Sequence, residues 1–161
     1  MISWLKGQII NNWYLSSKKG VVIACESIGY EVQLLSKHMN SIDISKTQEI
    51  WIHQIQREDA TNLYGFEDIN QRDLFRKIIS VNGIGPQIGM ALLEDFNVKQ
   101  LIELISSKDL KSLTKSQGVG KRIAERLIVE LKDKLQKYEN NEDKSSKISN
   151  ELSLNNFDRY L

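Results

Sequence analysis

Two different spacings of apolar residues divide the chain into an N-terminal and a central region. Up to about residue 66, apolar and polar positions alternate, or β-branched residues form short runs between turn residues. This spacing predicts five short strands, typical of a small closed barrel. The five segments are WLKGQII (4–10), GVVIAC (20–25), YEVQL (30–34), IWIHQI (50–55) and NLYGF (62–66).

Residues 68–138 have the spacing of amphipathic helices instead. NQRDLFRKIISV (70–81) places its apolar residues on one face, and Asn70 and Asp73 stand at the spacing of a capping box. Pro86 suits the first position of a helix, and Asn97 and Ser107 are expected to be N-caps. The longest helix carries a buried stripe with a period of four, made by Ile123, Leu127, Leu131 and Leu135.

From about Asn140 the chain is polar with few apolar residues, which predicts a flexible linker. We therefore expect an α+β protein. Its domains are a five-stranded barrel of the oligonucleotide-binding type over 1–67, an all-α domain over 68–139 and a linker or truncated C-terminal region over 140–161.

Composition excludes several classes of protein. The chain of 161 residues has no run of eighteen apolar residues, so no membrane span is expected. The start MISWLKG lacks the layout of a signal peptide, and the single Cys25 suits a reduced, cytoplasmic compartment. His38 and His53 have no companions at metal-ligand spacing, and no Ser-His-Asp set is present. We expect no metal, no other cofactor and no catalytic residue.

The charge is near zero overall but concentrated locally. Residues 111–137 contain eight Lys and Arg against three Asp and Glu, a net charge of +5. Lys121 and Arg122 stand where a helix is predicted to begin, although the positive end of a helix dipole disfavours cations there. The segment therefore suggests a bound anion.

A repeat in the sequence explains this placement. VNGIGPQIGMALLE (81–94) aligns with SQGVGKRIAERLIVE (116–130), and each copy predicts a helix, a Gly-aliphatic-Gly hairpin and a second helix. Glycine allows a tight turn and a close approach of the backbone to a ligand. The first amides of the second helix have no helical acceptor and suit an anion such as phosphate.

Two such hairpins suit a regularly charged polymer, and nucleic acid is the obvious one. The hairpins lack the glycine spacing of a dinucleotide site, and the chain has no P-loop. The plain alternative is a pair of tight helix–helix turns with ordinary surface lysines. Two matched copies within a basic segment favour phosphate binding. The predicted phosphate-binding residues are Gly83, Ile84, Gly85, Gln87, Gly118, Val119, Gly120, Lys121 and Arg122.

Four segments together resemble the RuvA family, the DNA-binding subunits of the bacterial Holliday junction branch migration complex. They are GYEVQL (29–34), REDATNLYGF (57–66), LFRKIISVNGIGP (74–86) and GVGKRIAERLIVELKDKL (118–135). The resemblance covers about residues 1–138. It implies a homotetramer, with an octamer left open, that holds a four-way junction open and flat for recombination and repair. It also implies a partner, the ring-shaped motor ATPase RuvB, so that the chain itself is not an enzyme.

The resemblance places the family's acidic pin on Glu58 and Asp59, which would keep DNA strands apart by repelling phosphates. Without the resemblance, a solvated hairpin tip would be the simpler interpretation. Arg57 and Arg126 are further candidate DNA contacts; Arg57 could instead pair with Glu58.

The chain departs from the family at three places. Gln87 replaces a common lysine, which predicts a weaker first hairpin, and Ser116-Gln117 replaces Leu-Pro, which predicts a looser entry turn. The family's C-terminal three-helix domain, which contacts the motor, is missing from the chain. Junction binding is therefore expected more firmly than coupling to RuvB.

Two other functions were weighed. A helix-hairpin-helix DNA glycosylase would need a catalytic Lys or Asp beside the motif, but Asp133 lies within the long helix. A single-strand-binding module would stack bases on barrel aromatics. Trp4, Trp51 and Tyr64 are more simply explained as core or subunit-contact residues.

Overall fold

The N-terminal half of the computed structural model, which describes residues 1–132, 134 and 135, is a closed barrel. The strands follow the order β1-β2-β3-β5-β4, and β1 closes the barrel by pairing with β4. A helix, α1 (Ser36–Ser41), joins β3 to β4, and β3 pairs with β5 in parallel. The predicted five-stranded barrel is confirmed. Its strands are β1 (Trp4–Leu15), β2 (Lys18–Cys25), β3 (Ile28–Gln33), β4 (Gln48–Gln56) and β5 (Thr61–Phe66).

The first strand is longer than the predicted 4–10 because it bends. Residues 4–7 pair with β4, whereas Gln8 and the residues after it pair with β2. The register shifts between Ile9 and Asn11, which leaves Ile10 unpaired and 64% exposed. Such a bulge bends a strand and increases its twist, so one strand serves both neighbours and the barrel can close. Beyond the bulge, β1 and β2 continue as a hairpin.

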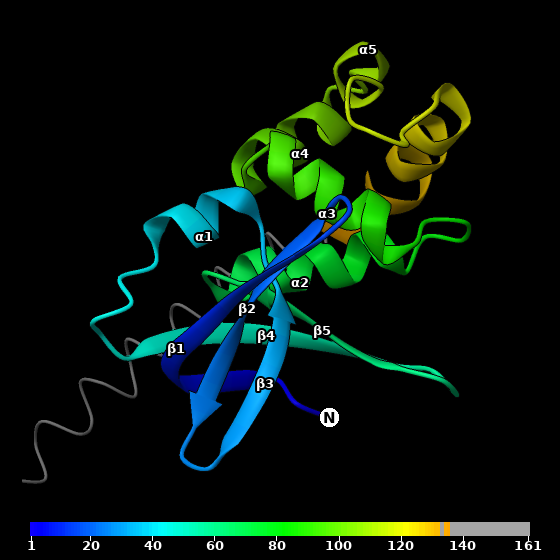
Figure 1. Ribbon diagram of the computed structural model, residues 1–161. Helices are drawn as coiled ribbons and strands as arrows, with labels where there is room; N and C mark the ends of the chain where they lie inside the picture. The colour runs from blue at the N-terminus through cyan, green and yellow to red at the C-terminus, as the bar shows by residue number, and fades with distance from the viewer. Residues whose placement is uncertain (133, 136–161) are drawn as a thin grey trace, which may run out of the picture.

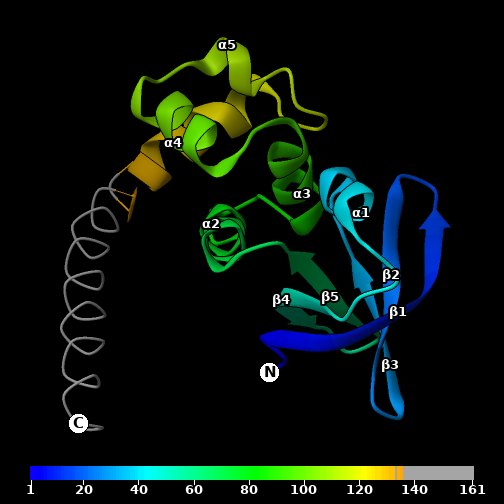
Figure 2. The same ribbon diagram turned by 90° about the vertical axis from the view of Figure 1, so that its left-hand side faces the viewer.

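The change from strands to helices falls between Phe66 and Ile69. The helices gather over one end of the barrel (Figures 1 and 2). They are α2 (Ile69–Ile79), α3 (Pro86–Asp95), α4 (Val98–Ser106), α5 (Leu110–Leu113) and a last helix described over 121–132 and at 134 and 135. The predicted linker over 140–161 and the end of the last helix lie outside the described residues.

Two predicted helix starts were wrong in detail. The N-cap of α2 is Asp68, whose side chain accepts from the Gln71 amide at 2.8 Å, so the helix begins before Asn70. Ser107 is the C-cap of α4, and Asp109 caps α5 instead. In both cases another polar residue of the same short stretch meets the amide. The capping box of Asn97 with Gln100 and the placement of Pro86 at the start of α3 are confirmed.

A single apolar cluster joins the barrel to the helices. Leu35, Tyr64 and Phe66 of the barrel belong to the same buried cluster as the helical core. Phe75 of α2 lies 4.9 Å from Phe66 and 5.3 Å from Tyr64, measured between ring centroids. Burial of these rings fixes α2 against the barrel, since each aromatic side chain removes a large apolar area from water.

Polar contacts fix the same joint at two more points. The Glu94 carboxylate of α3 accepts from the Ser36 amide at 2.9 Å, at the start of α1, and lies 3.5 Å from Lys19 Nζ. At the other contact, Arg72 is buried, lies 5.0 Å from the centre of the Trp51 ring and donates to the Ser3 carbonyl. These contacts hold the helices in one orientation on the barrel. None of the described helices combines the length and the hydropathy that crossing a bilayer requires.

Candidate nucleic-acid interface

The two Gly-aliphatic-Gly hairpins have the same backbone conformation. Gly83 and Gly118 have φ angles of +81° and +80°, in the left-handed region that favours glycine. In the first hairpin the Ile84 amide donates to the Val81 carbonyl at 3.1 Å, and in the second the Val119 amide donates to the Ser116 carbonyl at 3.0 Å. The repeat seen in the sequence is therefore also a repeat of structure.

The middle residue of each hairpin is an anchor. Ile84 is 5% exposed and Val119 is 4% exposed, and both belong to the helical core. The glycine that follows each anchor lies on the surface, where a Cβ on Gly85 or Gly120 would meet no atom within 4 Å. The glycine backbone and the amides beside it are thus open to a ligand.

A helix starts directly after each hairpin. Its first hydrogen bonds run from the Gly89 amide to the Gly85 carbonyl and from the Ala124 amide to the Gly120 carbonyl. The amides before these donors have no helical acceptor, and Gly85 offers no side-chain cap. Such a helix start binds anions through its amides and its dipole.

The two starts differ in strength. In the second hairpin Lys121 and Arg122 are exposed and add two charges, with Lys121 in a long contact of 3.9 Å to Glu125. At the aligned positions the first hairpin has Pro86, which lacks an amide hydrogen, and neutral Gln87. The geometry therefore offers the second hairpin one more amide and two more cations.

The hairpins support each other reciprocally. A Cβ on Gly118 would lie 3.6 Å from Ile88 Cγ1, so the helix after the first hairpin packs against the second hairpin. The helix after the second hairpin sends Arg126 back, and its Nη1 donates to the Asn82 carbonyl at 2.7 Å. Gln87 and Gly118 line one common hollow. Arg126, a candidate DNA contact, is thus placed as a brace for the first hairpin, a role that the sequence did not suggest.

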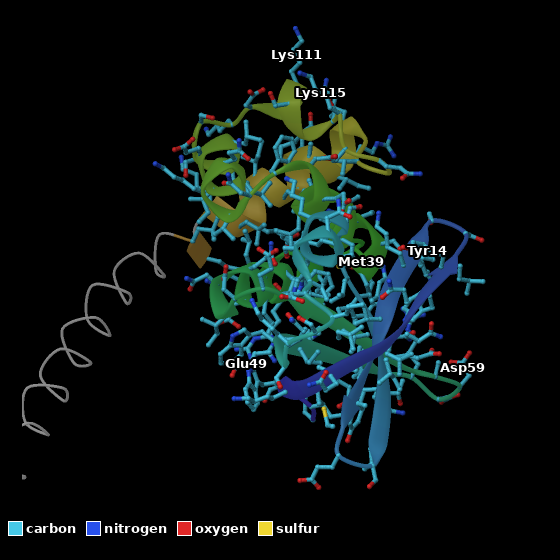
Figure 3. All side chains as sticks on the ribbon, turned by 60° about the vertical axis from the view of Figure 1, so that its left-hand side comes forward. Tyr14, Met39, Glu49, Asp59, Lys111 and Lys115 are labelled. Atoms are coloured by element: carbon cyan, nitrogen blue, oxygen red, sulfur yellow. The ribbon has the colours of Figure 1, made fainter. Side chains whose placement is uncertain are left out.

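The predicted acidic pin is the tip of the β4–β5 hairpin. The Arg57 amide donates to the Ala60 carbonyl at 2.8 Å, which closes a tight turn around Glu58 and Asp59. Both carboxylates are exposed, and in the described part of the chain neither forms an ion pair with Arg57 or any other cation. Figure 3 shows Asp59 at the far end of this hairpin. In Figure 1 the loop from α2 to α3 projects to the same side as this tip.

The barrel aromatics have separate environments. Tyr64 is buried in the helical cluster, Trp51 lies under Arg72, and Trp4 is 41% exposed. A polar contact lies beside them: His53 Nδ1 accepts from Arg76 Nε at 3.0 Å. Burial, and then the charges of Arg76 and Arg72, lower the pKa of His53. No three His, Cys, Asp or Glu side chains gather at metal-binding distance within the part of the chain described.

Comparison with known proteins assigns both halves of the chain. Residues 1–65 match the model of the RuvA N terminal domain, and residues 75–133 match the model of the SAM-like Helix-hairpin-helix tandem. Both matches agree with the barrel and the paired hairpins.

Similar full-length proteins carry the same name. The Holliday junction branch migration complex subunit RuvA of Prochlorococcus marinus (strain NATL2A) is 55% identical over 161 residues, which is the whole of this chain and 72% of that protein. The subunit RuvA of Synechococcus sp. (strain CC9311) is 54% identical over 135 residues, or 84% of this chain and 62% of that protein. With a barrel and tandem hairpins in the same order, the chain belongs to the RuvA family.

Proposed function

We propose that this chain is a non-catalytic, structure-specific DNA-binding subunit that binds four-way junctions and supports branch migration by a separate motor. The observation that carries the proposal is the pair of matched hairpins, whose exposed glycines and free amides open onto one surface. The names of the relatives, subunits of a Holliday junction branch migration complex, support it.

The hairpins would hold the sugar-phosphate backbone of each DNA arm. Amides at the two helix starts would donate to phosphate oxygens, and Lys121 and Arg122 would add charge-assisted contacts. Because these groups meet the backbone and not the bases, binding should depend little on DNA sequence. The second hairpin would contribute more affinity than the first, since Pro86 and Gln87 provide fewer donors and no charge.

The acidic pin would act at the crossover. In a homotetramer, two carboxylates from each of four subunits would meet near the four-fold axis. Glu58 and Asp59 are exposed and unpaired in the described structure, so their charge is available to repel phosphates. Such repulsion would keep strands apart while they exchange partners. Arg57 at the base of the turn would guide a backbone past the tip.

The homotetramer, the motor ATPase RuvB and the cytoplasm complete the proposal. Family membership supports the tetramer and the motor, and the free Cys25 suits a compartment that keeps thiols reduced. Four copies arranged with cyclic symmetry would present four identical faces to the four arms.

The proposal is tested by a mobility-shift titration of a four-way junction, a linear duplex and a single strand at several salt concentrations, with mass measurement of each complex. We expect the junction to bind most tightly and the complex to contain four copies. The variant carrying Lys121→Ala with Arg122→Ala should lower the salt slope by roughly 0.9 per lost phosphate contact. Equal affinity for all three DNAs, or an unchanged slope for the folded variant, would contradict the proposal.

A further inference from the structure

The β1–β2 hairpin, which the sequence did not mark as functional, faces the helical domain across a hollow. Ser17, Lys18 and Lys19 line one wall of this hollow, whose volume is about 380 Å³. The opposite wall includes Gln87 and Gly118, which belong to the predicted phosphate-binding residues. A group bound to the second hairpin therefore lies within reach of the barrel.

A second hollow continues from the first toward the acidic pin. It has a volume of about 330 Å³ and shares Lys18 and Gln33 with the first. Thr61 and Asn62, at the base of the pin, lie along its edge. The two hollows, together called the barrel groove here, thus connect the second hairpin to the pin. Figure 3 shows Tyr14 on the same side of the molecule as Asp59.

The charge of the first hollow suits a phosphodiester. Glu94, the one carboxylate among the described residues that line it, already accepts from the Ser36 amide and pairs with Lys19. Lys18 is exposed and forms no ion pair with any described residue. One uncompensated positive charge remains. The other polar lining groups are neutral and able to donate hydrogen bonds; they are Ser17, Gln33, Gln87 and Gln117.

The second hollow has a different character. Glu31 lines it and offsets Lys18 there, so a second phosphate is not favoured. Trp13 and Tyr14 also line it. The Trp13 indole donates to the Val21 carbonyl, which fixes its ring, whereas Tyr14 is 72% exposed at the end of β1. An exposed aromatic ring beside a polar groove suits stacking with a nucleobase.

We propose that the barrel groove is a third DNA-binding site, in which Lys18 binds one phosphate of the strand that runs from the second hairpin to the crossover. Tyr14 stacks against an adjacent base or sugar near the pin, where pairing is interrupted. The site takes a single strand segment of a few nucleotides and requires no particular base. This inference rests on the proposed function, because it names a further contact with the same junction.

The matched variants are Lys18→Gln and Lys46→Gln, which remove the same charge. Lys46 pairs with Asp43 at 3.2 Å before the start of β4, and the pin follows the end of β4, so the control lies far from the groove. We expect Lys18→Gln to lower the salt slope of junction binding by about 0.9, and Lys46→Gln to leave it unchanged. The effect should be smaller on a linear duplex, which has no strand leading to a crossover.

A second measurement locates the strand directly. Ser17→Cys in a Cys25→Ala background carries a photoactivatable thiol-reactive crosslinker, and the crosslinked nucleotides are mapped on the junction. Crosslinks within a few nucleotides of the crossover would support the barrel groove; crosslinks confined to the distal arms, or none at all, would overturn it.

The outcomes separate this inference from the proposed function. If Lys18→Gln behaves like Lys46→Gln while the Lys121→Ala, Arg122→Ala variant loses slope, the barrel groove is refuted and junction binding stands. A change in the mass of the DNA-free oligomer on Lys18→Gln or Tyr14→Ser would instead assign this surface to contacts between copies of the chain, which also overturns the inference. If no variant changes junction binding, the proposed function itself fails.

Discussion

Arg126 Nη1 donates a hydrogen bond of 2.7 Å to the main-chain oxygen of Asn82, two residues that are 44 positions apart. The contact ties the second helix-hairpin-helix motif to the first hairpin, beside Gly83. It stabilises the hairpin that has the weaker set of phosphate donors. The two hairpins are therefore expected to bind DNA as one rigid unit.

The first prediction concerns this brace. Replacing Arg126 by Gln removes the hydrogen bond, and such a bond contributes about 1 kcal/mol. We expect amide hydrogen exchange at Ile84 and Gly85 to become about fivefold faster, since 1.4 kcal/mol corresponds to a factor of ten. Lys121→Gln, which removes a cation from the same helix without touching the first hairpin, is the control. Equal exchange in both variants would show that Arg126 does not brace the hairpin.

The second prediction separates the two glycines of each hairpin. Gly118→Ala places a side chain at a φ of +80°, which costs about 1–2 kcal/mol of folding free energy and should lower the melting temperature. Gly120→Ala meets no atom within 4 Å, so the melting temperature should stay close to that of the wild type.

The same pair should behave differently on DNA. The Gly120→Ala methyl group occupies space that a phosphate needs, so junction affinity should fall by about tenfold, or roughly 1.4 kcal/mol, while the protein stays folded. Thermal unfolding and junction titration of both variants make the comparison. A Gly120→Ala variant with full junction affinity would remove this backbone from the phosphate site.

The third prediction concerns the acidic pin. Glu58→Gln with Asp59→Asn keeps the shape of the turn but removes the charges. A repulsion between unit charges at contact distance in water is about 1 kcal/mol, so junction affinity should be unchanged or up to about fivefold tighter. Glu103→Gln on α4 serves as a charge control. Sharply weaker junction binding by the folded pin variant would refute the repulsive role.

The fourth prediction is a pH dependence of stability. Burial, then Arg76 and Arg72, lower the pKa of His53. A base with a lowered pKa in the folded protein stabilises the fold above its unfolded pKa of about 6.5 and loses this contribution as the pH falls through the folded value. We therefore expect the free energy of unfolding to decrease between about pH 7 and pH 5.

His38 contributes in the same direction, because burial lowers its pKa against the opposing effect of Glu67. The lowered pKa values of Asp43 and Asp109 act only in more acidic solution. Urea unfolding at several pH values tests this, with His53→Gln as the variant. The pH dependence should become shallower in His53→Gln; a curve parallel to the wild type would exclude His53 as a source.

Much of the fold could be predicted because the signals are local. The alternation in YEVQL and the Gly-aliphatic-Gly repeats specify backbone conformations over a few residues, and the structure has β3 and two identical hairpins there. The bulge at Ile10 could not be predicted, since it answers the need of one strand to pair with two neighbours. The cap at Asp68 was missed because several polar residues in that stretch are equally suitable caps.

The sequence by itself determined the barrel strands, the paired hairpins and the acidic turn, because φ preferences and apolar periodicity act between near neighbours. Only the tertiary structure decided that Arg126 meets Asn82, that Ile88 packs on Gly118 and that Lys18 shares a hollow with both hairpins. These contacts join residues distant along the chain. They arise from burying the common core formed by α2, α3 and the barrel, and no local pattern encodes them.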